Sequence, residues 1–217
     1  PTEVTIRDVY IKIAKIFLRP KPPSIPFMIH DIFPTPLWHI TPEPYDAVLL
    51  LDLVDELYKG AYRIKEKYSS KNRSNRGGYQ SPNFSWNDFH PQGKKYVDEI
   101  IINQLIECHG TRDIKTSHKV KSWWYNISGK GHWNIPHTHP DCNFALVWYL
   151  TPSDGLLVLM SPFPQRRTGD IDKHGDHIII DAKKGDIIMF PSDIIHYVKP
   201  NPKDTDRISI SMNLQFY

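Results

Sequence analysis

The feature that most constrains the fold is a change of hydrophobic pattern about halfway along the chain. Up to residue 108, apolar residues recur at helical spacing, over 47–64 and again over 94–108. Beyond that point, short β-branched and aromatic segments alternate with Gly, Pro and Asp turns; they cover residues 119–128, 135–140, 144–151, 156–161, 177–181, 186–191, 195–199 and 206–216. Helices followed by about eight strands predict a mainly β fold, a sandwich or jelly roll with helices packed on one sheet.

The length of 217 residues predicts one domain that buries a substantial core. We assign residues 28–217 to this domain and treat residues 1–27 as an N-terminal extension, with a strand expected at 28–33. Residues 69–93 are rich in Ser, Asn, Gly and Pro and predict a long loop, which we interpret as a substrate lid.

Charge and cysteine content argue against several kinds of partner. The net charge is +3 and the basic residues are spread along the chain, so no nucleic-acid footprint is expected. Cys108 and Cys142 have neither metal-site spacing nor the number that a disulfide framework needs. No apolar run is long enough to span a bilayer and no signal-peptide core precedes the domain, which predicts a cytoplasmic location.

The segment Pro136-His137-Thr138-His139-Pro140-Asp141 contains three side chains that bind metals. Alternate residues of a strand share a face, so His137, His139 and Asp141 can point to one place, and His196 follows on a later strand. Three such ligands on one side of an iron ion leave positions free for oxygen and a co-substrate. Two ligand sets remain open, His137/His139/His196 and His139/Asp141/His196.

The last predicted strand alternates cleanly between apolar and polar residues. Ile208, Ile210, Met212 and Leu214 share one face, and Arg207, Ser209, Ser211 and Asn213 share the other. If both faces of the sheet are covered, the polar row needs partners, because burying unpaired polar groups is costly. A bound carboxylate suits the planar fork of arginine. The alternative is that Arg207 pairs with Asp204 or Asp206 at the surface.

Several motifs together resemble a family of 2-oxoglutarate/iron(II) oxygenases common in marine bacteria and their phages, which is similar to prolyl hydroxylases. The resemblance runs from about residue 28 to the end and rests on Phe33-Pro34-Thr35-Pro36, Ser74-Asn75-Arg76-Gly77-Gly78-Tyr79-Gln80-Ser81, Trp124-Tyr125-Asn126-Ile127, Asn134 to Pro140, Phe190-Pro191-Ser192, His196 to Pro200 and Arg207 to Ser211. It implies a cupin-like double-stranded β-helix and, for a phage-encoded chain, a location in the host cytoplasm.

The resemblance also implies the reaction and the roles of residues. Fe(II) and 2-oxoglutarate would be bound, and a C–H bond, first of all in a protein or peptide, would be hydroxylated with release of succinate and CO₂. Arg207 and Ser209 would hold the far carboxylate of 2-oxoglutarate. Ser128 stands where the wider family often has a tyrosine, so Asn126 or Tyr125 would supply the missing contact.

Two rival functions remain open at this point. One is a cupin-type dioxygenase with three histidines that needs no 2-oxoglutarate, because His139 stands where the wider family has a carboxylate. The other is a jelly-roll module that binds a metal without catalysis. A zinc hydrolase is disfavoured, since no glutamate stands beside the two histidines to act as general base.

Overall fold

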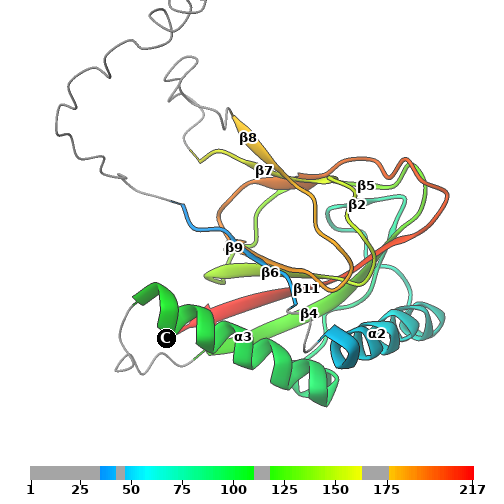
Figure 1. Ribbon diagram of the computed structural model, residues 1–217. Helices are drawn as coiled ribbons and strands as arrows, with labels where there is room; N and C mark the ends of the chain where they lie inside the picture. Colours follow the sequence, from blue (N-terminus) through cyan, green and yellow to red (C-terminus); the bar gives the residue numbers. More distant parts are fainter. Residues whose placement is uncertain (1–34, 43–46, 110–117, 163–175) are drawn as a thin grey trace, which may run out of the picture. The chain divides into compact units, whose positions relative to one another are not determined.

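The computed structural model describes residues 35–42, 47–109, 118–162 and 176–217, although the side chains of 47–49 and 102–109 are left out of the description (Figure 1). The chain divides between Pro34 and Thr35, and every described residue belongs to the compact unit Thr35–Tyr217. The predicted extension 1–27 and the predicted strand 28–33 therefore lie outside the described residues.

The described part contains two antiparallel β-sheets (Figure 1). The larger has six strands in the order β1 (Trp38–Ile40), β9 (Ile187–Pro191), β6 (Phe144–Tyr149), β11 (Arg207–Phe216), β4 (His118–Ser128) and β3 (Tyr79–Gln80). The smaller has five, in the order β2 (Asn75–Arg76), β5 (Trp133–His137), β10 (His196–Val198), β7 (Leu157–Met160) and β8 (His177–Ile180). Strands far apart in sequence are neighbours in both sheets, which is the arrangement of a jelly roll, or double-stranded β-helix. The predicted fold class is confirmed.

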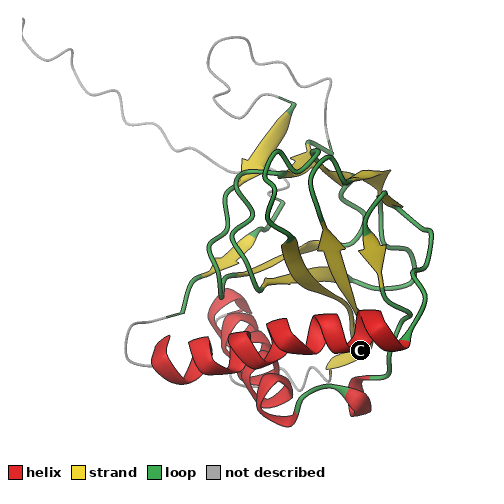
Figure 2. Cartoon of the chain, turned by 90° about the vertical axis from the view of Figure 1, so that its right-hand side faces the viewer, coloured by secondary structure: helices red, strands yellow, loops and turns green. Residues whose placement is uncertain are grey.

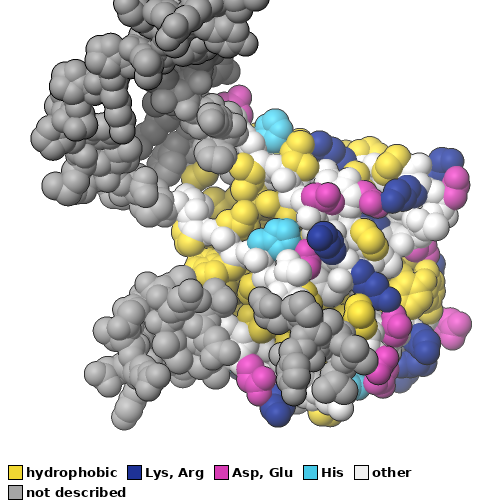
Figure 3. Space-filling model, viewed as in Figure 1, with side chains coloured by type: hydrophobic (Ala, Val, Ile, Leu, Met, Phe, Trp, Pro, Cys, Tyr) yellow, Lys and Arg dark blue, Asp and Glu magenta, His cyan; other side chains and the backbone are white. Residues whose placement is uncertain are grey.

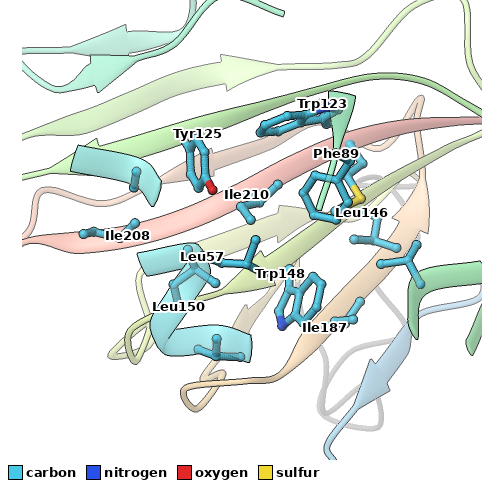
Figure 4. Packing of buried hydrophobic residues seen from close by; sticks show 14 of the residues in the cluster. Leu57, Phe89, Trp123, Tyr125, Leu146, Trp148, Leu150, Ile187, Ile208 and Ile210 are labelled. Atoms are coloured by element: carbon cyan, nitrogen blue, oxygen red, sulfur yellow. The ribbon is translucent and has the colours of Figure 1, made fainter. Parts of the chain in front are cut away.

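Two helices, α2 (Ala47–Lys67) and α3 (Pro91–His109), lie beside the larger sheet (Figure 2). Several of their apolar residues, among them Val54, Ala61 and Val97, are fully buried in one cluster with residues of the larger sheet. Figure 4 shows part of this cluster, in which Leu57 packs near Trp148. Burying a side chain such as Leu57 contributes about 1.5–3 kcal/mol of stability. The apolar contacts of the cluster therefore hold the two helices on the outer face of the larger sheet.

The central strand β11 presents different residues to its two sides, as its sequence predicts. Ile208, Ile210, Met212 and Leu214 are fully buried in the cluster beneath the helices. The alternate residues of the strand face the smaller sheet, because successive side chains of a strand point to opposite faces. There they line a pocket between the sheets that includes Arg207, Ser209 and Ser211.

The segment 69–93 is more ordered than its composition predicts, so its prediction as one long loop is wrong. It contains β2, β3 and a 3₁₀ turn, η1 (Trp86–Asp88), and α3 begins at Pro91 rather than at residue 94. Proline is favoured in the first turn of a helix, where a backbone N–H has no partner to lose. Because β2 pairs with β5 and β3 pairs with β4, the segment joins both sheets.

No helix in the described ranges is long and apolar enough to cross a membrane. On the face drawn in Figure 3, basic and acidic side chains are interspersed.

Candidate metal and co-substrate site

Three histidine side chains meet between the two sheets. His137 ends β5, His139 follows it in the next loop, and His196 begins β10. One ring nitrogen from each lies within 4.8 Å of the others, and Nε2 of His139 is 3.2 Å from Nε2 of His196. Within the described ranges, these three residues form the group with the geometry to hold a metal ion.

Strand pairing explains how residues so distant in sequence come together. β10 pairs with β5 in antiparallel register, and His196 stands directly opposite His137. Alternation predicted that His137 and His139 share one strand. This prediction is wrong, because β5 ends at His137. Instead the backbone N–H of His139 donates to the carbonyl oxygen of Ser192 at 2.9 Å, which ties the loop to the end of β9.

The hydrogen bonds of the three rings fix which nitrogen is free. Nδ1 of His137 lies 2.7 Å from the carbonyl oxygen of Ile135, and Nδ1 of His196 lies 2.9 Å from that of Ile194. Nδ1 of His139 lies 2.8 Å from Oδ1 of Asn213. Because each partner is an acceptor, each Nδ1 must carry the proton, and each Nε2 keeps a lone pair. Three Nε2 lone pairs are thus available at one place for a metal.

Burial keeps these rings neutral at physiological pH. It lowers the pKa of His139 to about 4 and that of His196 to about 3, and it also lowers the pKa of His137. The neighbouring rings add to the effect, since a second positive charge nearby is unfavourable. Metal binding requires neutral imidazole, so no proton has to be displaced from the site near neutral pH.

Arg207 lies in the same pocket, and no carboxylate of the described residues supplies its counter-charge. The residue is 5% exposed, its Nε has no hydrogen-bond partner, and none of the described carboxylates pairs with it. Asp204 contacts Lys130, and Asp206 accepts from the Tyr62 hydroxyl, so neither serves the arginine. A buried cation without a partner is costly, and an organic carboxylate entering the pocket would supply one. The residues present therefore fit both a metal and a carboxylate-bearing co-substrate.

The pocket contains most, but not all, of the predicted co-substrate contacts. Its lining residues are Ser74, Trp124, Asn126, Asn134, His137, His139, Ala145, Leu146, Val147, Tyr149, Leu157, His196, Val198, Arg207, Ser209 and Ser211. Asn126 donates to the Ser211 hydroxyl at 2.9 Å, and Ser209 is 2% exposed.

Tyr125 is not in this pocket, which corrects the expectation that it contacts the co-substrate. It belongs to the core on the helix side of the sheet (Figure 4), where its hydroxyl lies close to Gly60. Tyr149 is the tyrosine that lines the pocket. Burial raises the pKa of Tyr149 to about 12, and the nearby charge of Arg207 partly counters that rise.

Asp141 lies outside the histidine group. Its side chain is exposed, its φ is 67°, and its backbone carbonyl accepts from Nζ of Lys121. This backbone conformation suits the turn that follows Pro140. The structure thus brings together the set of three histidines, while the second set, with Asp141, would require the turn to rearrange.

Sequence reasoning gave Asn213 no role at the site. The available signal was its place at the end of the polar row on β11, four residues beyond Ser209. Its contact with His139 depends on the pairing of β11 with its neighbours, which sequence spacing does not reveal.

The fold and this pocket define a class: a double-stranded β-helix with histidines and a buried arginine between its sheets. Residues 122–213 match a family model described as "Putative 2OG-Fe(II) oxygenase". This stretch contains all three histidines, Arg207 and Asn213, and over it the chain is similar to the 2-oxoglutarate/Fe(II) oxygenases of that family.

Solved structures agree on the fold. The chain is similar to a prolyl-4-hydroxylase from Pseudomonas putida, with 14% identity, a TM-score of 0.56, and coverage of 83% of this chain and 92% of that chain. It is similar to a Trichoplax adhaerens prolyl hydroxylase solved with a peptide fragment of hypoxia inducible factor (15% identity, TM-score 0.54, coverage 82% and 83%). It also resembles HygX from Streptomyces hygroscopicus, solved with nickel and 2-oxoglutarate (9% identity, TM-score 0.57, coverage 98% and 87%). No curated protein matches the chain.

Proposed function

We propose that this chain is an Fe(II)- and 2-oxoglutarate-dependent dioxygenase that hydroxylates a C–H bond and releases succinate and CO₂. The observation that carries the proposal is the presence, in one pocket, of three histidine Nε2 atoms and a buried arginine that pairs with no carboxylate of the described residues. The first feature suits an iron ion with open positions, and the second suits the remote carboxylate of 2-oxoglutarate.

The residues of the pocket have different roles in the proposed reaction. His137, His139 and His196 would hold Fe(II), which with 2-oxoglutarate supplies the oxidising chemistry. Arg207 would bind the far carboxylate of the co-substrate, with Ser209 beside it on the same face of β11. Asn126 also lines the pocket, and the aromatic side chains of Tyr149 and Trp124, which line it too, would help to exclude water.

Anaerobic titration of the iron-loaded protein with 2-oxoglutarate tests this proposal. Chelation of the metal by the co-substrate should produce a weak visible charge-transfer band. Arg207→Ala should require much more 2-oxoglutarate to reach the same band, because the remote carboxylate then has no cation to bind. Arg63→Ala is the matched control, since Arg63 is exposed and does not line this pocket. Iron binding without any band would refute the proposed co-substrate.

A second candidate is a dioxygenase that uses three histidines and no 2-oxoglutarate. It is favoured by one observation: within the described ranges, the metal-binding group contains no carboxylate. This candidate predicts that Arg207→Ala retains full oxygenase activity, whereas the co-substrate proposal predicts its loss. A non-catalytic module would instead bind metal and release no succinate from 2-oxoglutarate under any condition.

A protein or peptide is the first substrate class to test. Support comes from the fold shared with two prolyl hydroxylases, one of them solved with a peptide. HygX, which has also been solved with hygromycin B, shares the fold equally well and makes a small molecule the competing class. A proline-containing peptide library assayed for succinate release separates the two: release with peptides supports the first, and release only with small molecules refutes it.

The segment 69–93 contributes to the pocket, although it is not a free lid. Ser74 lines the pocket, its hydroxyl accepts from the Asn134 amide at 3.1 Å, and its carbonyl oxygen accepts from the N–H of Ile135 at 3.0 Å. Deleting residues 72–84 would remove the edge strands β2 and β3, so substitution of Ser74 is the better probe of substrate contact. Ser74→Val should reduce substrate turnover more than binding of 2-oxoglutarate.

A further inference from the structure

Asn213 is the last member of the polar row on β11 and has no role in the function proposed above. Its Oδ1 lies 2.8 Å from Nδ1 of His139. We infer that Asn213 is the positioning residue of the site: its amide oxygen sets the tautomer and the direction of the His139 ring. The inference rests on the metal site proposed above and concerns a residue that would touch neither metal nor co-substrate.

The other two histidines do not need such help. His137 and His196 each donate from Nδ1 to a carbonyl oxygen two residues earlier in the chain, at 2.7 and 2.9 Å. Their orientation therefore comes from local backbone geometry. His139 follows the end of β5, and its Nδ1 finds an acceptor 74 positions away in sequence, on a strand of the opposite sheet. Of the three histidines, only His139 has a side-chain oxygen rather than a backbone carbonyl as the acceptor for its Nδ1.

Other contacts hold the backbone and plane of His139 but do not choose which nitrogen faces the metal. Its N–H donates to Ser192, and Sγ of Cys142 lies 3.3 Å from its carbonyl oxygen. Trp124 stacks on the ring, with centroids 5.6 Å apart and planes 17° apart. A half-turn of the ring about its Cβ–Cγ bond would preserve all three contacts and move Nε2 away from His196. The bond to Asn213 distinguishes the two orientations, because an Oδ1 acceptor requires Nδ1–H.

The neutral amide also sets the charge of the site. Three neutral imidazoles add no charge to a divalent ion, and Asn213 supplies an acceptor without adding one. An aspartate at this position would keep the acceptor and place a negative charge against the ring, which makes a ligating histidine more basic. Asn213→Asp and Asn213→Leu therefore separate orientation from charge.

The test measures Co(II) binding to the metal-free protein by visible absorption, under anaerobic conditions, for wild type and three variants. Asn213→Leu removes the hydrogen-bond acceptor and keeps a side chain of similar volume, whereas Asn213→Asp keeps the acceptor. Gln215→Leu is the matched control: it lies on the same strand, and its amide bonds to Asn143 rather than to a histidine. Two-bond ¹H–¹⁵N NMR of the metal-free protein reports the tautomer of His139 directly.

We expect Asn213→Leu to weaken Co(II) binding by about 10–100-fold, and Asn213→Asp to bind at least as tightly as wild type. Gln215→Leu should bind as wild type does, and wild-type His139 should be protonated on Nδ1. Unchanged Co(II) binding in Asn213→Leu, an equal loss in Gln215→Leu, or a proton on Nε2 of wild-type His139 would each overturn the inference.

Failure of the proposed function gives a different result. Wild-type protein that binds no Co(II) would refute the metal site itself, and the tautomer of His139 would still decide the role of Asn213. If Asn213→Leu does not fold, the role of Asn213 is decided by Co(II) binding to Asn213→Asp and by the tautomer of His139 in the wild-type protein, because both proteins have the acceptor.

Discussion

Replacing Arg207 by methionine is expected to stabilise the ligand-free protein and to abolish its stabilisation by 2-oxoglutarate. Arg207 is 5% exposed, and its guanidinium is paired with no described carboxylate. Burial accordingly lowers its pKa, which records the cost of keeping the charge away from water. Methionine keeps much of the length of the side chain and removes the charge.

The expected magnitudes follow from this burial. Replacing a buried charge by an apolar side chain of similar volume often stabilises a protein by about 1–4 kcal/mol. In a domain of this size each kcal/mol raises Tm by ~2–4 °C, so the ligand-free variant should melt ~2–16 °C higher than wild type. A co-substrate present at about 100 times its Kd stabilises wild type by about 2.7 kcal/mol, and the variant should gain almost none of this.

Urea unfolding of the metal-loaded proteins under anaerobic conditions, with and without 2-oxoglutarate, measures both effects. Arg63→Met is the control, because Arg63 is exposed and its loss should change neither quantity by more than about 0.5 kcal/mol. A ligand-free Arg207→Met protein that is less stable than wild type would refute the reasoning. That result would mean that the guanidinium is well solvated or paired in the ligand-free state.

Three further predictions concern pH, glycines and a buried carboxylate. The lowered pKa values of His139 and His196 mean that the unfolded chain takes up protons below the ordinary histidine pKa, about 6.5, while the folded chain does not. The metal-free protein should thus lose stability as pH falls from about 6.5 toward 4, and His196→Leu should flatten this slope in urea unfolding. Gly77 and Gly131 both have φ near +75 to +80°, but a Cβ at Gly77 would lie 2.5 Å from the His132 ring and one at Gly131 would meet nothing within 4 Å. Gly77→Ala should therefore lower the free energy of unfolding by clearly more than the ~1 kcal/mol expected for Gly131→Ala. Equal losses of stability in the two variants, measured by calorimetry, would show that the contact with His132 has no effect. Oδ2 of the buried Asp186 contacts Nε2 of His39 at 2.7 Å and accepts from the N–H of Lys183, so Asp186→Leu should destabilise the protein by about 1.5–3 kcal/mol, the usual contribution of hydrogen bonds to a charged group, measured by thermal unfolding.

The sequence was most informative where polar and apolar residues alternate. On β11 the alternation predicted which residues face the core and which face the pocket, because a strand with one apolar side has only one favourable orientation. On β4 this signal is missing: Trp123, Trp124 and Tyr125 are all buried, on both sides of the sheet. The assignment of Tyr125 to the pocket was wrong for this reason, and its neighbour Asn126 lines the pocket instead.

Long-range features escaped prediction for a related reason. The spacing of His137 and His139 indicated a metal site, yet alternation placed them on one strand, whereas β5 ends at the first of them. Arg207 is not paired with Asp204 or Asp206 because these two residues contact Lys130 and Tyr62, and the contact of Asn213 depends on strand register. Such facts arise from packing between sheets, on which local sequence has little influence.

β11 also constrains how this protein can evolve. The strand presents Arg207 to the pocket and Asn213 to His139, six residues or roughly 20 Å apart at the usual rise per residue, while its other side forms the centre of the core. Insertion or deletion of one residue within the strand would exchange the two faces, bringing charge into the core and isoleucine into the pocket. Variation here is therefore confined to substitution, and changes of length that alter substrate choice must occur in the connections between strands.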